Sequence, residues 1–179
     1  KNMNNPATDL IIIGGGAAGL MAGTMAGELG LRAVVIERKH HPARKLLMCG
    51  NNRCNLTSDR SVPDMLAAYG EPVASFLAPA LGGFPPTALR RWFASRGLKT
   101  TVHADGRVFP ISERADDVLH CLTDSLRDVA VPLLTNCPVT DVGRLAEGFR
   151  VTAPAIELTV PCVLIATGGV SYPKTGSVG

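Results

Sequence analysis

The chain has 179 residues, of which 46% are hydrophobic, so it can bury one sizeable core, and we predict a single domain over residues 1–179. A net charge of +3 and an aromatic content of 4% argue against a nucleic-acid partner. The five cysteines include no Cys-x-x-Cys pair, which is typical of a reducing cytoplasm. The sequence predicts neither a signal peptide nor a membrane span.

The most informative segment is a short apolar run that leads into a glycine-rich turn. Residues 9–13 are mostly apolar, the pattern Gly-x-Gly-x-x-Gly occupies residues 14–19, and helical periodicity covers residues 16–29. In a dinucleotide-binding unit these glycines make the tight turn, let the backbone approach a pyrophosphate and let the helix pack on the strand. The helix N-terminus offers N–H groups and a positive dipole end to that anion.

A second strand and an acidic residue extend the pattern. Gly23 lies one turn beyond the third glycine, and Gly30 follows the helix as a C-terminal cap. Residues 33–37 form a strand that ends in Glu37, at the spacing at which an acid binds ribose hydroxyls. Its charge disfavours a 2′-phosphate, an exclusion that Arg38 weakens. The alternative is a glycine-rich turn without a ligand, and the shared register of glycines and acid argues against it.

The remaining elements mix helices with short strands. Residues 39–60 read as a polar loop and residues 133–160 as a small β-meander. The closing strand, residues 163–166, is fully apolar, so we expect it to be buried on both faces beside the first strand. This order predicts an α/β protein with a Rossmann-like fold. The other predicted helices cover residues 63–69, 71–81, 86–96 and 114–129, and the other predicted strands cover residues 100–103, 107–109, 133–135, 139–142, 149–153 and 156–160.

The histidines and hydroxyl residues suggest no separate chemistry. No pair of the four histidines has metal-ligand spacing with a third partner, so we predict no metal site. No Ser/His/Asp set is recognisable, which argues against a nucleophilic hydrolase.

Several further segments carry two resemblances to known families. The run Ile-Ala-Thr-Gly-Gly at residues 165–169, together with the glycine pattern and Glu37, resembles the two-dinucleotide-binding-domain flavoproteins. In them the Ala-Thr-Gly turn lies close to the nucleotide and to the first glycine loop. Residues 44–58, with residues 106–110 and 168–177, resemble the YhiN/BaiN-like bacterial flavoproteins, often labelled aminoacetone oxidase-family enzymes, some of which are dehydro-bile-acid reductases.

The signature loop departs from the resembled family at three positions. Cys49 replaces the usual Ser, Asn52 the usual Gly and Ser58 the usual Asn. If position 52 needs a positive φ, Asn tolerates it better than most residues but less well than Gly.

The resemblance assigns a role to this loop. Arg53 can hold a phosphate or the electron-rich edge of an isoalloxazine, and Lys45 can neutralise a pyrophosphate. Composition alone fits a plain surface loop equally well. The resemblance implies that Arg53 and Asn55 contact the cofactor. It supports a contact by Lys45 less strongly.

Three side chains keep alternative interpretations. Cys54 can form a disulfide with Cys49 or a flavin adduct, but we favour a small packing residue beneath the loop. Ser171 and Tyr172 can line the cofactor mouth, and Tyr172 can donate a proton or simply shape the turn before a proline. We assign no catalytic residue. The predicted cofactor-binding residues are Gly14, Gly16, Ala17, Ala18, Gly19, Glu37, Arg38, Lys45, Asn51, Arg53, Cys54, Asn55, Ala166, Thr167, Gly168 and Gly169.

The resemblance implies an FAD/NAD(P)-binding fold of which these residues are the N-terminal part. Members of the resembled family are much longer, so we expect the inserted substrate domain and the C-terminal part of the fold to be absent. We expect this chain alone to bind FAD weakly and to turn nothing over.

We therefore expect the FAD-binding portion of a cytoplasmic oxidoreductase that uses NAD(P)H and acts on a small molecule. We expect no nucleic-acid and no membrane partner, and we predict no oligomeric state. The alternatives are an NAD-dependent dehydrogenase, a non-catalytic nucleotide-binding fragment and, less favoured, a flavin-dependent RNA-modifying protein.

Overall fold

The computed structural model describes residues 8–154 and 156–171, which group into two compact units. Unit 1 comprises Lys1–Leu46 with Leu122–Gly179, and unit 2 comprises Leu47–Cys121. Helix α6 (Ala115–Asp128) runs from unit 2 into unit 1. That all 179 residues fold as one domain stays a prediction, and the two units are described separately.

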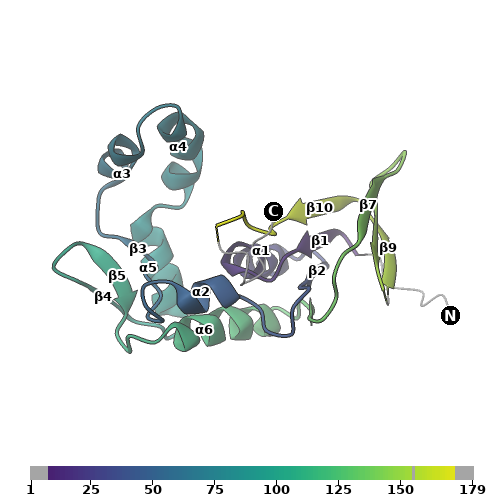
Figure 1. Ribbon diagram of the computed structural model, residues 1–179, viewed down its shortest axis with the longest axis horizontal. Helices are drawn as coiled ribbons and strands as arrows, with labels where there is room; N and C mark the ends of the chain where they lie inside the picture. The colour runs from purple at the N-terminus through teal and green to yellow at the C-terminus, as the bar shows by residue number, and fades with distance from the viewer. Residues whose placement is uncertain (1–7, 155, 172–179) are drawn as a thin grey trace. The chain divides into compact units, whose positions relative to one another are not determined.

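A parallel sheet forms the centre of unit 1. Its strands are β1 (Leu10–Ile13), β2 (Ala33–Ile36), β6 (Leu133–Leu134) and β10 (Cys162–Ile165), in the order β10-β1-β2-β6. Helix α1 (Ala17–Glu28) connects β1 to β2 (Figure 1). The carboxyl ends of three strands are in register, because Ile13 lies opposite both Ile36 and Ile165. The predicted strand–turn–helix–strand unit and the return of the last strand beside the first are confirmed.

A second sheet packs against the parallel sheet of unit 1. Its antiparallel strands are β7 (Asp141–Arg144), β8 (Phe149–Ala153) and β9 (Ile156–Val160). Val151 and Val160 of this sheet form one buried cluster with isoleucines of β1 and β2. The sequence placed the start of this meander at residue 133. The meander instead begins at Asp141, because β6 pairs in parallel with β2.

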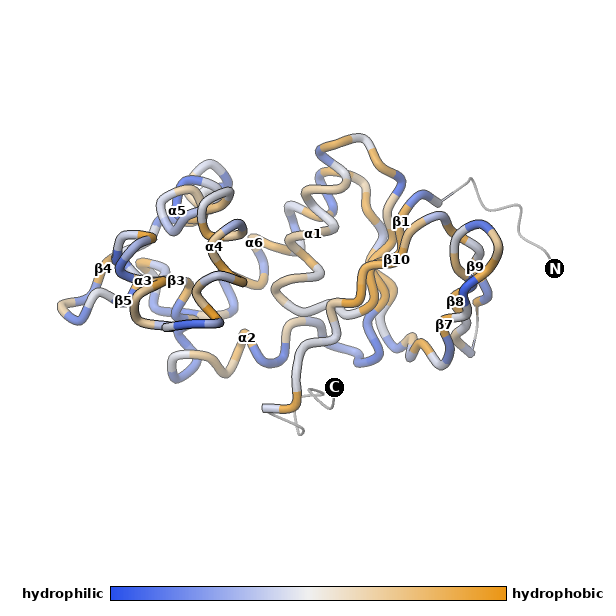
Figure 2. The backbone as a smooth tube through the Cα atoms, turned by 90° about the horizontal axis from the view of Figure 1, so that it is seen from above, coloured by the Kyte–Doolittle hydropathy of each residue, from blue (hydrophilic) through white to orange (hydrophobic). Residues whose placement is uncertain are grey.

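Strand β10 is more exposed than the sequence indicated. Figure 2 shows that it is hydrophobic along its length, as β1 is. Yet Leu164 is 39% and Ile165 is 68% exposed, so the expectation of burial on both faces is wrong. Within the described residues, β10 lies at the edge of the sheet with β1 as its neighbour, so few side chains cover it.

Helix α1 lies close to the sheet because its inward face carries glycine. A Cβ added at Gly23 would lie 2.8 Å from a methyl carbon of Val35, as the sequence predicted for this helix face. The helix ends at Glu28 and is followed by Leu29 as its C-cap and by Gly30, whose φ is +77°, and the Leu31 N–H donates to the Ala26 carbonyl at 3.0 Å. This is the Schellman ending typical of a C-terminal glycine.

Unit 2 is built on a small antiparallel sheet with helices. Its strand order is β3-β5-β4, and Val108 and Phe109 of the central strand are fully buried. The sequence missed α2 and β3, because both are very short and lie in the segment predicted as a loop. The elements are β3 (Thr57–Ser58), β4 (Thr100–Val102), β5 (Arg107–Pro110), α3 (Val62–Tyr69), α4 (Val73–Gly83) and α5 (Pro86–Ser95), and α2 (Arg44–Met48) crosses the boundary between the units.

Helices α3 and α4 form a hairpin with no buried side chain (Figure 1). Phe76 of α4 is 83% exposed. By contrast, Trp92 and Phe93 anchor α5 in the core of unit 2. No helix in the described part of the chain is both long enough and apolar enough to cross a membrane.

We predict that Gly19→Ala lowers the free energy of unfolding by about 2–4 kcal/mol, the scale of a severe packing clash. A Cβ at Gly19 would lie 1.9 Å from the backbone oxygen of Gly14, which has no flexible side chain to move away. Urea denaturation measures the effect.

The matched control is Gly82→Ala, because Gly82 is also helical and a Cβ there meets no atom within 4 Å. This variant should be neutral or stabilised by about 0.5–1 kcal/mol. Equal stability of the two variants would contradict the predicted clash.

The ion pair between Asp9 and Arg32 predicts a pH dependence. The side-chain hydrogen bond from Arg32, at 2.6 Å, lowers the pKa of Asp9 to about 2. A carboxyl whose pKa is lower in the folded chain stabilises it above the unfolded pKa, and this contribution is lost as the pH falls from about 4 towards 2. In Asp9→Asn, the free energy of unfolding should therefore fall less between pH 4 and pH 2 than it does in the wild type. Urea denaturation at a series of pH values measures this difference. The control variant Asp141→Asn, on exposed β7, should keep the wild-type pH dependence.

Candidate nucleotide-binding site

Two glycines of the turn after β1 are required by packing within unit 1. Gly14 has φ +113°, and a Cβ there would lie 2.5 Å from the carbonyl oxygen of Ala166. Gly19 faces the Gly14 carbonyl and lies near the Ile12 side chain. These contacts agree with the predicted tight turn and close approach of helix to strand.

Gly16 has a different reason to be glycine. It is the N-cap of α1 with an ordinary extended backbone (φ −78°, ψ −177°), and a Cβ there would meet no described atom within 4 Å. Neither conformation nor packing among the described residues requires glycine here. The space lies at the helix N-terminus beside exposed Ala17 and Ala18, whose N–H groups have no partner inside the helix. This cradle fits a phosphate group, which a side chain at Gly16 would obstruct.

The Glu37 carboxylate ties the end of β2 to this turn. Its Oε2 accepts the Gly15 N–H at 2.8 Å, and its Oε1 accepts the Lys39 N–H at 2.8 Å. A Cβ at Gly15 would lie 2.9 Å from the Glu37 Cβ, so this glycine is also needed. Sequence reasoning missed Gly15, and the signal was its place within three consecutive glycines. Each carboxylate oxygen keeps a lone pair that can accept from a ribose hydroxyl.

The turn after β10 lies against the glycine turn. The Ala166 N–H donates to the Ile13 carbonyl at 2.8 Å, and Gly14 approaches the Ala166 carbonyl as described above. Thr167, Gly168 and Gly169 follow as exposed residues. The resemblance implied this proximity, and the structure brings the two segments together.

Basic residues of unit 1 border the same region in different ways. Lys45 of α2 places its Nζ 3.2 Å from the Ser171 hydroxyl, and the Ala43 N–H donates to the Gly15 carbonyl at 2.8 Å. These contacts link α2 to the glycine turn and to the segment after β10. Arg38 is exposed at the end of β2. Tyr172 lies outside the described residues.

The signature loop of unit 2 has a left-handed backbone. Gly50, Asn51, Asn52 and Cys54 have φ values of 58°, 57°, 63° and 60°. Position 52 therefore does need a positive φ, and Asn is among the residues that tolerate it. The Asn52 carbonyl accepts the Ala115 N–H at 2.9 Å, which ties the loop to the start of α6.

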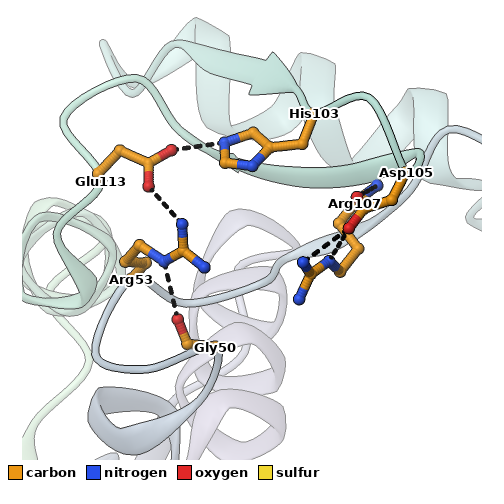
Figure 3. Close-up of polar contacts among 6 residues, drawn as sticks. All are labelled: Gly50, Arg53, His103, Asp105, Arg107 and Glu113. Atoms are coloured by element: carbon orange, nitrogen blue, oxygen red, sulfur yellow. Dashed lines mark hydrogen bonds and ion pairs between the residues drawn. The ribbon is translucent and has the colours of Figure 1, made fainter.

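Arg53 connects this loop to a carboxylate that the sequence did not reveal (Figure 3). Its Nη1 lies 3.0 Å from Glu113 Oε2, its Nε donates to the Gly50 carbonyl at 3.1 Å, and its guanidinium lies 4.7 Å from the Phe109 ring centre. Glu113 Oε1 lies 2.6 Å from His103 Nε2. Arg53 thus uses two of its hydrogen-bond donors inside unit 2. Its predicted contact with the cofactor stays a prediction.

Glu113 is ionised at neutral pH. Partial desolvation raises its pKa, but the hydrogen bonds from His103 and Arg53 outweigh this and hold the pKa below its usual range. The carboxylate is therefore a fixed negative charge between an arginine and a histidine.

Cys54 and Asn55 hold the other side of the loop. Cys54 is 4% exposed, and burial, with a smaller contribution from Cys49, raises the pKa of its thiol to about 12. With the Asn55 amide nitrogen turned towards the strands, it donates to the Val108 carbonyl at 3.2 Å and to the Thr57 carbonyl at 2.8 Å. The buried, protonated Cys54 thiol supports the packing interpretation.

None of the five cysteines, all of which are described, forms a disulfide. Across residues 8–154 and 156–171, no group of three or more His, Cys, Asp and Glu side chains is arranged to hold a metal ion.

Curated relatives match nearly the whole chain. It is 32% identical over 170 residues to the 3-dehydro-bile acid delta(4,6)-reductase of Clostridium scindens, covering 94% of this chain and 41% of the relative. It is 30% identical to the ribosomal RNA dihydrouridine synthase of Escherichia coli, covering 94% of this chain and 41% of that protein. The chain thus spans about two fifths of the length of these relatives.

Solved structures share the fold at low identity. The 3-ketosteroid-delta4-(5alpha)-dehydrogenase from Rhodococcus jostii has a TM-score of 0.62 at 16% identity, covering 96% of this chain and 48% of that chain. The THI4 protein of Thermovibrio ammonificans has a TM-score of 0.58 at 13% identity, covering 90% of this chain and 58% of that chain. These likenesses establish the fold alone.

The family itself is shown by a match to most of the sequence. The family model of the HI0933-like protein Rossmann domain matches residues 8–179, which include the glycine turn, Glu37, the signature loop and the turn after β10. The chain belongs to the HI0933-like family and forms its Rossmann domain.

Proposed function

We propose that this chain is the FAD-binding part of a flavin-dependent oxidoreductase. The observation that carries the proposal is Gly16, a glycine at a helix N-terminus that nothing among the described residues requires. Room for a phosphate explains it. The HI0933-like family match supports a dinucleotide at this position.

The residues of unit 1 divide the binding task. The N–H groups of Ala17 and Ala18 and the α1 dipole would hold the pyrophosphate, and Lys45 would add positive charge. Glu37 would accept the ribose hydroxyls while its bonds to Gly15 and Lys39 keep it in place. When bound, FAD supplies hydride transfer, and the protein supplies position and electrostatics.

We further propose that NAD(P)H is the electron donor and that the substrate contains a carbon–carbon double bond next to a carbonyl. The names of the two relatives above support this class, because a delta(4,6)-reductase and a dihydrouridine synthase both saturate such a bond. One hydride and one proton are added across the double bond, and NAD(P)⁺ is released.

We favour a small-molecule substrate in the cytoplasm, and RNA is the second candidate. The dihydrouridine synthase relatives favour RNA. Two arginines of unit 2 argue the other way, because Arg90 pairs with Asp59 at 3.1 Å and Arg107 pairs with Asp105 at 2.6 Å, which reduces their attraction for phosphates. The absence of any disulfide is consistent with a reducing compartment.

We predict that the chain binds FAD and that Gly16→Val raises the Kd for FAD by at least about tenfold, or roughly 1.4 kcal/mol. The Val side chain would fill the space at the N-terminus of α1, while an extended backbone suits it. Quenching of flavin fluorescence during titration measures the affinity.

Gly82→Ala serves as the control for this titration and should leave the Kd unchanged, because Gly82 lies in α4 of unit 2 with open space around it. The thermal midpoint of Gly16→Val should stay within a few degrees of the wild type, since no described atom is displaced. An unchanged Kd in Gly16→Val would refute the phosphate cradle.

A second titration separates the substrate classes. Fluorescence anisotropy with a short uridine-containing RNA should show weak binding, with a Kd no tighter than about 10⁻⁴ M at physiological salt, typical of non-specific contact. Tight, saturable binding that persists at high salt would favour the RNA candidate over the small molecule.

A further inference from the structure

Glu113 occupies an unusual backbone position in unit 2. It lies in the turn between β5 and α6, its φ is 57°, and its N–H donates to the Pro110 carbonyl at 3.0 Å. A non-glycine residue in the left-handed region carries strain that the surrounding contacts must offset. The turn itself therefore does not explain why a carboxylate stands here.

The contacts of the carboxylate give an explanation (Figure 3). One oxygen binds Arg53 at 3.0 Å and the other binds His103 at 2.6 Å. The Arg53 side chain is 34% exposed and that of Glu113 is 37% exposed, so the pair is partly shielded from water. Arg53 also holds the Gly50 carbonyl and packs on Phe109, so its guanidinium is fixed from three directions.

The signature loop therefore rests on the turn that carries Glu113. The Ala115 N–H, two residues beyond Glu113, donates to the Asn52 carbonyl at 2.9 Å. Gly50 lies so close to Phe109 of β5 that an added Cβ would be 2.9 Å from the ring. The loop is thus held at three points: Gly50 packs on Phe109 of β5, Arg53 bonds to Glu113 of the following turn, and the Asn52 carbonyl accepts from the first residue of α6.

We propose that Glu113 is a positioning residue that acts through Arg53 to keep the signature loop, residues 50–55, in the conformation that binds FAD. This inference rests on the proposed function. Glu113 does not itself touch the cofactor. It orients the Arg53 guanidinium through the hydrogen bond to Nη1, and the other N–H groups of the guanidinium are then available to a ligand.

The first experiment needs no ligand. We compare the Arg53 Nη–H signals by low-temperature NMR and the amide hydrogen exchange of residues 50–55 in the wild type, Glu113→Gly and Glu113→Gln, because Nη1 is the Arg53 atom that contacts Glu113. Glu113→Gly removes the carboxylate while suiting the positive φ, so the fold should keep its thermal midpoint. We expect the Arg53 signal to be lost and the exchange to accelerate at least about tenfold.

Glu113→Gln should restore the Arg53 signal in part, since the amide oxygen can still accept its hydrogen bond. The matched control is Asp105→Ala. It removes another carboxylate of unit 2, one that pairs with Arg107 and not with the signature loop. It should leave loop exchange unchanged. Unaltered Arg53 dynamics in Glu113→Gly would overturn the proposal.

The second experiment is a double-mutant cycle on FAD affinity. Arg53→Ala and Glu113→Gly should each raise the Kd for FAD at least about tenfold, and the double variant should be no weaker than Arg53→Ala within about threefold, because both remove the same interaction. Additive losses, or unchanged affinity in Glu113→Gly, would show that Glu113 does not act through Arg53. Failure of the wild type to bind FAD would refute the proposed function alone, and the ligand-free experiment would still decide whether Glu113 positions the loop.

Discussion

The Gly15–Glu37 hydrogen bond is the constraint on which the candidate site of unit 1 depends. It joins the turn after β1 to the end of β2, and the parallel register of these strands brings the two groups to the same edge of the sheet. In the function proposed above, the same bond would hold the carboxylate where a ribose binds, so a single interaction would place both the helix terminus that faces the pyrophosphate and the acceptor for the sugar.

The four glycines of this turn look alike in the sequence, but the reasons for a glycine differ from one position to the next. Gly14 and Gly19 face backbone atoms that a side chain would strike, and Gly15 faces the stem of Glu37. Gly16 faces open space. Packing therefore accounts for three of the glycines, and only the fourth points to something outside the chain. This difference separates glycines that packing requires from the glycine at which we propose that a phosphate binds, and it makes Gly16 the more informative position for function.

Charge in unit 2 is arranged to fix a loop. The carboxylate of Glu113 lies between Arg53 and His103, while Cys54 and Asn55 anchor the opposite side of the loop through burial and backbone hydrogen bonds. A loop of left-handed residues is costly in isolation, because each such residue needs outside contacts to hold it. The polar composition that reads as a flexible surface loop therefore describes a segment held on several sides.

Local pattern determined much of this protein: the strand–turn–helix–strand unit, the cap at Gly30 and the place of Glu37 at the end of the second strand all follow from spacing and backbone preference. Tertiary structure alone decided the exposure of β10, the pairing of β6 with β2, and the partnership of Arg53 with Glu113, which lie 60 residues apart. The physical reason is the sequence distance over which each effect acts. Periodicity and φ preferences act over a few residues, whereas burial, strand order and ion pairing depend on which distant segments the fold brings together.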